Sequence, residues 1–196
     1  MLLAGLAAVA AVLVVAFALF SPAGAGGYTC GSQLAASSTG SDGVVTPDMG
    51  RQHVRAGTRL RYAQCPPSSG DHYGERLAAG FYGPETEQSP GAWVHSLEHG
   101  YVAILYSCGA GGTTCPSADE LDALRQFQDD APSTPGAQAC GIPSEVLTVR
   151  FDAMAARFAY VAWDRVFLTD TFDAAAARTF AATWIDQRTL PEAANC

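Results

Sequence analysis

The cysteines constrain the fold of this chain more than any other feature of its sequence. There are six among 196 residues, all beyond the apolar start of the chain, and none has the C-x-x-C spacing of a metal knuckle or redox motif. A dispersed, even set predicts structural disulfide bonds formed outside the cytoplasm. Cys108 and Cys115 flank a glycine-rich loop, which favours a local bridge between them. The other four must then pair among themselves, in an arrangement that the sequence leaves open: Cys30, Cys65, Cys140 and Cys196.

The first residues of the chain form an uninterrupted apolar segment. Residues 1–20 carry no charge, and as a helix they extend about 30 Å, enough to cross a bilayer. Residues 23–25, Ala-Gly-Ala, resemble a signal-peptidase site, but the apolar run is longer than a signal core of about 7 to 15 residues. We therefore predict that residues 1–22 are a transmembrane anchor or a signal segment, with a retained anchor favoured. The cysteines then place the rest of the chain on the extracytoplasmic side.

Composition divides the remainder into two parts. Residues 23–43 are rich in glycine, serine, threonine and alanine without apolar periodicity, which predicts a flexible linker. Residues 44–196 contain enough apolar sequence for one compact domain.

Within this domain, apolar periodicity predicts both strands and helices. Four segments are typical of strands: 58–62, 101–106, 146–151 and 158–168. Ser117 and Glu120 form a capping box that opens one helix, and apolar residues at i, i+3 and i+4 spacing within 173–187 predict a second. Strands interleaved with two main helices, without regular βαβ alternation, predict an α+β fold with a mainly antiparallel, disulfide-stapled sheet.

The charge of the chain excludes two classes of partner. The chain contains arginine but no lysine, and its formal net charge is -8 with a pI near 4.8. Such a surface repels nucleic acid and anionic lipid headgroups.

The histidines suggest the chemistry of the domain. His95 and His99 lie four residues apart, which places both rings on one side of a helical turn, and His53 and His72 precede them. Imidazole is the commonest protein ligand for zinc and copper, so this clustering predicts a metal site. Alternatively, the histidines are structural and hydrogen-bond neighbouring loops.

Methionine bears on which metal such a site would hold. Beyond residue 22 the chain has Met49, four residues before His53, and Met154. Thioether ligands combined with histidine suit copper, especially Cu(I), whereas histidines alone suit zinc equally well. We expect copper, with zinc as the alternative, and packing in the core or a loop is the competing role for each methionine.

Residues 95–99 also spell H-x-x-E-H, a zinc peptidase signature in which the glutamate activates water. That signature needs a substantial helix. Pro90 and Gly91 lie just upstream, and Gly100 ends any helix immediately, so the context for a substantial helix is poor and peptidase activity is the weaker alternative. Glu98 is then expected to accept an imidazole N–H or to pair with an arginine.

A stiff loop precedes His72. Residues 66–70, Pro-Pro-Ser-Ser-Gly, restrict the backbone and supply hydroxyl groups for local hydrogen bonds. This loop either presents His72 toward His95 and His99 or is a tight turn whose histidine satisfies buried carbonyls. Asp71 adds a carboxylate that would orient or weaken the His72 ligand.

Four phrases in order carry a resemblance to a known family: residues 50–54, 66–72, 94–100 and 162–165. They resemble the motifs of the bacterial family named domain of unknown function 3105. That family's usual phrases are similar to Pro-Pro-Thr-Ser-Gly-Pro-His and Ala-Trp-Gly-Arg, so Ser68, Asp71 and Asp164 are departures here. The resemblance implies a membrane-anchored or secreted bacterial domain and brings no settled activity.

These observations together predict a single-pass protein of the bacterial cell membrane with an extracytoplasmic metal-binding domain. The expected role is copper handling or delivery, with a membrane protein complex or metalloenzyme as partner. The alternative is a non-catalytic accessory subunit that docks on a membrane complex.

Overall fold

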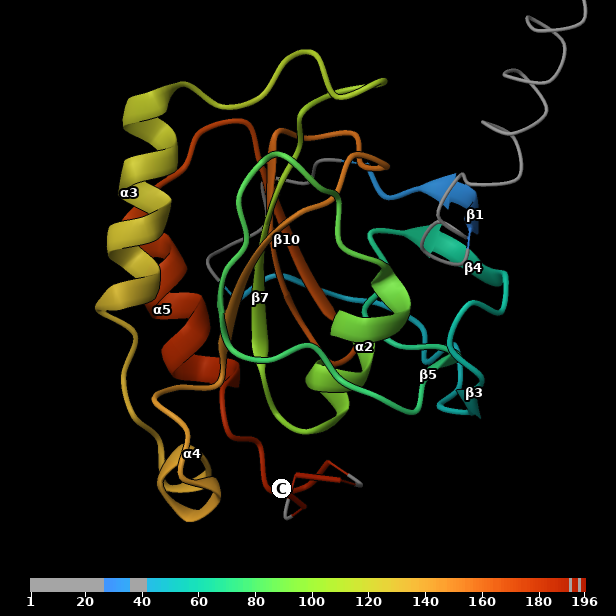
Figure 1. Cartoon of the computed structure of the whole chain (residues 1–196), viewed down its shortest axis with the longest axis vertical. Coiled ribbons are helices and arrows are strands. Elements are labelled where there is room, and N and C mark those ends of the chain that lie inside the picture. Colours follow the sequence, from blue (N-terminus) through green and yellow to red (C-terminus); the bar gives the residue numbers. More distant parts are fainter. Residues whose placement is uncertain (1–26, 36–41, 191, 194) are drawn as a thin grey trace, which may run out of the picture.

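The computed structural model describes residues 27–35, 42–190, 192–193 and 195–196 (Figure 1). Over these ranges, no helix has the length and apolar character needed to cross a bilayer. The predicted membrane segment, residues 1–22, lies outside the described residues, as do residues 23–26 and 36–41 of the predicted linker.

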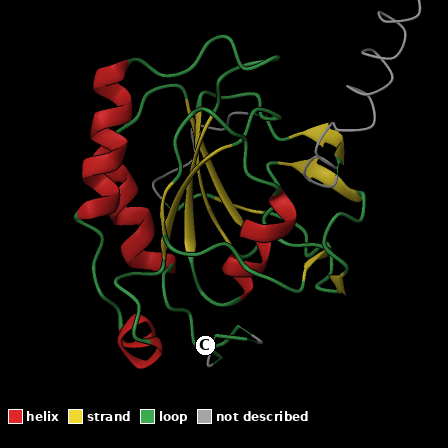
Figure 2. Ribbon diagram, viewed as in Figure 1, coloured by secondary structure: helices red, strands yellow, loops and turns green. Residues whose placement is uncertain are grey.

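A sheet forms the centre of the domain (Figure 2). It has six strands, in the order β2-β10-β9-β7-β8-β6. Its strands are β2 (Val44–Val45), β6 (Gly80–Phe81), β7 (Val102–Tyr106), β8 (Val146–Arg150), β9 (Phe158–Ala162) and β10 (Arg165–Thr169). The pairings from β2 to β7 are antiparallel, but β7–β8 and β8–β6 are parallel. The prediction of a mainly antiparallel sheet is therefore corrected to a mixed one. A helical crossover separates β7 from β8 and returns the chain in the same direction.

Different helices cover the two faces of this sheet (Figure 1). The described helices are α2 (Pro90–Glu98), α3 (Ala118–Asp129), α4 (Pro135–Cys140) and α5 (Ala174–Trp184). Side chains alternate along β7, so Val102 and Ile104 pack with α3 and α5, whereas Ala103 and Leu105 pack with α2. The two main helices predicted from the sequence are confirmed as α3, with its capping box, and α5.

Part of the predicted linker is a strand. β1 (Tyr28–Gln33) pairs in parallel with β4 (Leu60–Cys65), and a disulfide joins Cys30 to Cys65. The Tyr28 ring packs 5.3 Å from that of Phe151, measured between centroids. The flexible-linker prediction for 23–43 is thus corrected at residues 28–33. These residues lack a periodic signal because β4 and the disulfide, rather than an apolar stripe, hold them in place.

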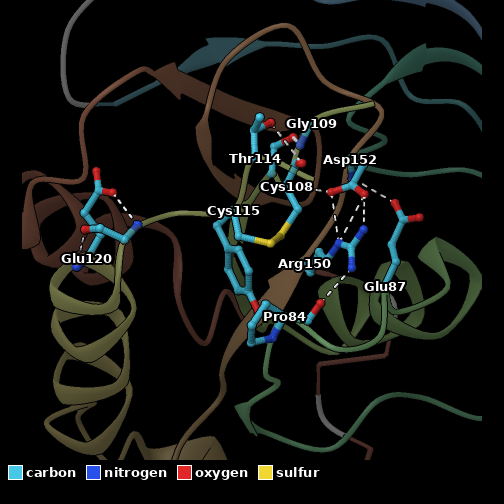
Figure 3. The surroundings of a disulfide bond; sticks show 12 residues. Pro84, Glu87, Cys108, Gly109, Thr114, Cys115, Glu120, Arg150 and Asp152 are labelled. Atoms are coloured by element: carbon cyan, nitrogen blue, oxygen red, sulfur yellow. Dashed lines mark hydrogen bonds and ion pairs between the residues drawn. A yellow bond between two sulfur atoms is a disulfide. The ribbon is translucent and has the colours of Figure 1, made fainter. Parts of the chain in front are cut away.

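All six cysteines form disulfides. The predicted Cys108–Cys115 bridge is confirmed, and Figure 3 shows it closing the loop that follows β7. Asp152 anchors this loop, because its carboxylate accepts the backbone N–H of Cys108 and pairs with Arg150. The third bridge, Cys140–Cys196, ties the end of the chain to the last residue of α4.

Candidate metal centre

Helix α2 positions three of the candidate residues. Ser89 caps it and Pro90 occupies its first turn, where a missing backbone N–H costs nothing. Pro90 and Gly91, which in the sequence are a poor context for a substantial helix, instead begin this nine-residue one. It ends at Glu98, with His99 as its C-cap, and Gly100 follows with a φ of +91°. His95, Glu98 and His99 consequently share the last helical turn.

The two upstream histidines come together by strand pairing. β3 (His53–Val54) runs parallel to β5 (His72–Tyr73), with His53 directly opposite His72. The loop before β5 fixes the ring of His72, because its Nδ1 lies 2.8 Å from the Gly70 carbonyl and must donate to it. Gly70 has a φ of +118°, which favours glycine at this position. The structure therefore assigns the orientation of His72 to the Gly70 carbonyl rather than to Asp71.

All four histidine rings converge on one place. The ring centroids of His53, His72 and His95 are 4.6 to 4.9 Å from one another, and that of His99 is 4.9 Å from the His95 centroid. Nε2 of His95 lies 3.1 Å from Nε2 of His99. Most of this group is buried, but the side chain of His53 is 41% exposed and leaves one side open to solvent.

Two carboxylates complete the group. The Glu98 Oε2 atom lies 3.1 Å from His72 Nε2 and 3.8 Å from His53 Nε2. Glu192, from the end of the chain, places Oε2 3.1 Å from His99 Nε2 and 3.5 Å from His95 Nε2. We call these six residues the histidine–glutamate cluster: His53, His72, His95, Glu98, His99 and Glu192.

Glu192 is absent from the sequence-based set of candidates. It lies nearly a hundred residues beyond His99 and belongs to no motif, so no local pattern marks it. The Cys140–Cys196 bridge holds its segment, and the Asn195 carbonyl lies 2.9 Å from His99 Nδ1. The Arg76 guanidinium, which can only donate, places Nη1 3.0 Å from the same Nδ1. Burial lowers the pKa of His99, and the positive charge of Arg76 lowers it further.

The cluster has the composition of a metal site. Three sets of side chains each bring their ligand atoms within 4.8 Å of one another. The sets are His53–His72–His95, His95–His99–Glu192 and His53–Glu98–Glu192. The chain therefore contains a possible metal site made of imidazole and carboxylate groups.

Burial sets the protonation of the imidazoles. It lowers the pKa of His95 to about 4, with His72 as a further cause, and it also lowers the pKa values of His72 and His99. These rings are neutral at neutral pH, which is the form that binds metal. Burial has the opposite effect on Glu98, whose pKa it raises.

Several buried atoms of the cluster have no hydrogen bond. These atoms are His72 Nε2, His95 Nδ1 and Glu98 Oε2. Because the proton of neutral His72 is on Nδ1, its Nε2 lone pair points at the Glu98 carboxylate only 3.1 Å away. Two acceptors face each other there, and a cation between them relieves the repulsion. The expectation that Glu98 accepts an imidazole N–H is therefore not met in this tautomer.

The methionines and Asp71 take other places. Met154 is 7% exposed in the core on the α2 side of the sheet, and Met49 packs against the same core. The Met49 amide donates to the Ser69 hydroxyl. The role of either methionine as a thioether ligand remains a prediction. The Asp71 backbone carbonyl accepts the Tyr62 hydroxyl, so this residue supports the loop.

Metal-free protein should lose stability in acid partly through His95. With the pKa lowered from 6.5 to about 4 by folding, His95 binds a proton more readily in the unfolded chain. Its contribution to stability is therefore present above pH 6.5 and lost as the pH falls toward 4. Urea unfolding in a chelator should show a larger loss between these pH values for the wild type than for His95→Gln. The raised pKa of Glu98 has the opposite effect on stability as the pH falls, and this effect is present in both proteins. Equal losses of stability in the wild type and His95→Gln would therefore contradict the role assigned to His95.

Comparison with known proteins adds a family match. A family model described as "Protein of unknown function (DUF3105)" matches residues 53–196, which include the whole histidine–glutamate cluster. This match confirms the resemblance seen in the sequence motifs. Comparison with curated proteins and with solved structures yields no match.

Proposed function

The chain belongs to the family described as Protein of unknown function (DUF3105), and we propose that it binds a divalent transition metal through the histidine–glutamate cluster. The observation that carries the proposal is the arrangement of acceptor atoms. Lone pairs of neutral imidazoles and two carboxylates converge in a largely buried space, with buried nitrogen and oxygen atoms lacking hydrogen bonds. Such atoms cost about 1–3 kcal/mol each when unsatisfied, and a bound cation offsets that cost.

The ligand atoms favour copper over zinc, and Cu(II) over Cu(I). Among divalent ions, nitrogen and oxygen ligands bind Cu(II) most strongly. Cu(I) prefers soft sulfur, but all cysteines are in disulfides and Met154 packs in the apolar core. We therefore propose Cu(II) as the preferred ion and Zn(II) as the alternative.

The cellular role that we propose is copper handling at the outer side of the bacterial cell membrane. Residues 1–22 would anchor the chain, and the domain would deliver or store copper for a membrane protein complex or metalloenzyme. Three disulfides support an oxidising compartment, where intracellular reductants do not reach the bridges. The exposed side chain of His53 offers a route for an ion between solvent and the cluster.

Metal titration tests the proposal. The full chain, without a polyhistidine tag and in detergent, is titrated with Cu(II) and Zn(II) in competition with a chelator. We expect saturable binding that weakens at least about 100-fold in the double variant His95→Ala/His99→Ala, because two ligands are lost. Glu75→Gln, which changes an exposed carboxylate outside the cluster, is the control and should bind as the wild type does.

The same titration separates metal binding from a purely structural role of the histidines. Weak binding that is equal in the wild type and the double variant would support a non-catalytic docking subunit instead. Circular dichroism of both proteins establishes that the variant is folded, so that lost binding reflects lost ligands.

A zinc peptidase is the second candidate, because the H-x-x-E-H residues lie at the end of the nine-residue helix α2 and Glu192 supplies a third ligand beside His95 and His99. The environment of Glu98 weighs against it. This residue is 2% exposed and its carboxylate faces His72, which leaves it poorly placed to activate water against a substrate. Hydrolysis of casein that requires zinc and disappears in Glu98→Gln would favour the peptidase.

A further inference from the structure

We propose that the histidine–glutamate cluster holds two metal ions, with Glu192 bridging them. This inference rests on the proposed metal-binding function and adds the number of ions and their division among the ligands. One ion would be held by His95, His99 and Glu192, and the other by His53, Glu98 and Glu192, with His72 beside Glu98.

The first support is a contact that occurs twice. His72 donates from Nδ1 to the Gly70 carbonyl and turns Nε2 toward Glu98, 3.1 Å away. His99 places Nδ1 2.9 Å from the Asn195 carbonyl and 3.0 Å from Arg76 Nη1, and it turns Nε2 toward Glu192, also 3.1 Å away. In both pairs a backbone carbonyl lies beside Nδ1 and Nε2 faces a carboxylate oxygen, which is the arrangement that metal-binding histidines use. Each pair therefore offers one imidazole nitrogen and one carboxylate oxygen to a cation of its own.

The second support is the number of ligands. Four imidazoles and two carboxylates lie in the cluster. A zinc or copper ion typically takes about four protein ligands, so a single ion would leave part of the cluster buried and unsatisfied. Two ions that share a carboxylate use all six side chains.

The third support is the position of Glu192 between the two groups. Its Oε2 atom is 3.1 Å from His99 Nε2 and 4.0 Å from His53 Nε2. Glu192 belongs to both carboxylate-containing sets, whose ligand atoms lie within 4.8 Å of one another. Ions that share it would have a separation near the roughly 3.5–4 Å of two-metal sites. Two carboxylates and a chain charge of -8 offset the positive charge.

Stoichiometry and magnetic coupling test the inference. The full chain in detergent is loaded with Cu(II), separated from free metal, and analysed by elemental analysis and electron paramagnetic resonance. We expect two copper ions per chain, with a resonance intensity well below that of two isolated ions because neighbouring Cu(II) centres couple. One ion per chain with full intensity would overturn the inference and leave the proposed function standing, whereas no bound copper would overturn both.

Single variants separate the two positions. His99→Ala and His53→Ala should each retain one ion with uncoupled intensity, because each removes a ligand from a different position. Glu192→Gln should reduce coupling, while Glu75→Gln should keep two coupled ions. If the cluster holds one ion, His99→Ala and His53→Ala would instead both weaken the binding of that one ion. The wild type would then show no magnetic coupling, and Glu192→Gln would show none either.

Discussion

Replacing Cys140 and Cys196 by serine is expected to lower the free energy of unfolding by about 4 kcal/mol and to weaken metal binding at least about tenfold. The bridge closes a loop between cysteines 56 residues apart, and long loops gain most from closure. It also holds the segment that carries Glu192 and the Asn195 carbonyl. Without the bridge, that segment must be ordered each time an ion binds, so affinity falls with stability.

The control for this variant is the replacement of Cys108 and Cys115 by serine. That bridge spans only 7 residues and lies beyond the end of β7 away from His99. Its loss should cost about 2 kcal/mol and leave metal affinity unchanged. Urea unfolding measures the first quantity and chelator competition the second. Equal metal affinity in the two double variants would contradict the role assigned to the Cys140–Cys196 bridge.

Saturating metal is expected to raise the free energy of unfolding by about 4 kcal/mol when free metal is about 1,000 times its Kd. The ion binds the folded cluster but finds no preformed site in the unfolded chain, so binding energy becomes folding energy. Thermal unfolding with Cu(II), with Zn(II) and with a chelator measures this gain. Adding chelator to the loaded protein should remove it.

The double variant His95→Ala/His99→Ala is the control for metal stabilisation. Its unfolding temperature should be nearly the same with metal and with chelator. A gain as large as that of the wild type would mean that the ion binds elsewhere, and the cluster would lose its assigned function.

Local patterns in the sequence predicted the elements that interactions between nearby residues stabilise. The capping box at Ser117 and Glu120 marks the start of α3, and i, i+3, i+4 spacing marks α5. Cys108 and Cys115 pair as predicted because only a short loop separates them. Asp164 shows how a departure from the family pattern is accommodated: its φ of 55°, in the β9–β10 turn, suits the glycine of the family phrase and is one that aspartate tolerates.

Local sequence patterns did not predict the elements that depend on contacts between distant segments of the chain. Pro90 and Gly91 are a poor context for a helix locally, but the packing of α2 against β5 and the sheet favours one that starts at Pro90. The parallel pairing of β7 with β8 follows from the crossover that contains α3 and α4. Residues 28–33 form a strand because β4 offers its edge, which composition alone does not reveal.

The sequence by itself determined which histidines are candidates and that His95 and His99 share a helical face, because their spacing is fixed by the backbone of one turn. Only the tertiary structure decided that His53 lies opposite His72, that Glu98 points at His72, and that Glu192 joins the cluster. Those contacts link segments separated by tens of residues. They form because the free energy of the whole fold outweighs the entropy of closing the intervening loops, and no short stretch of sequence records that balance.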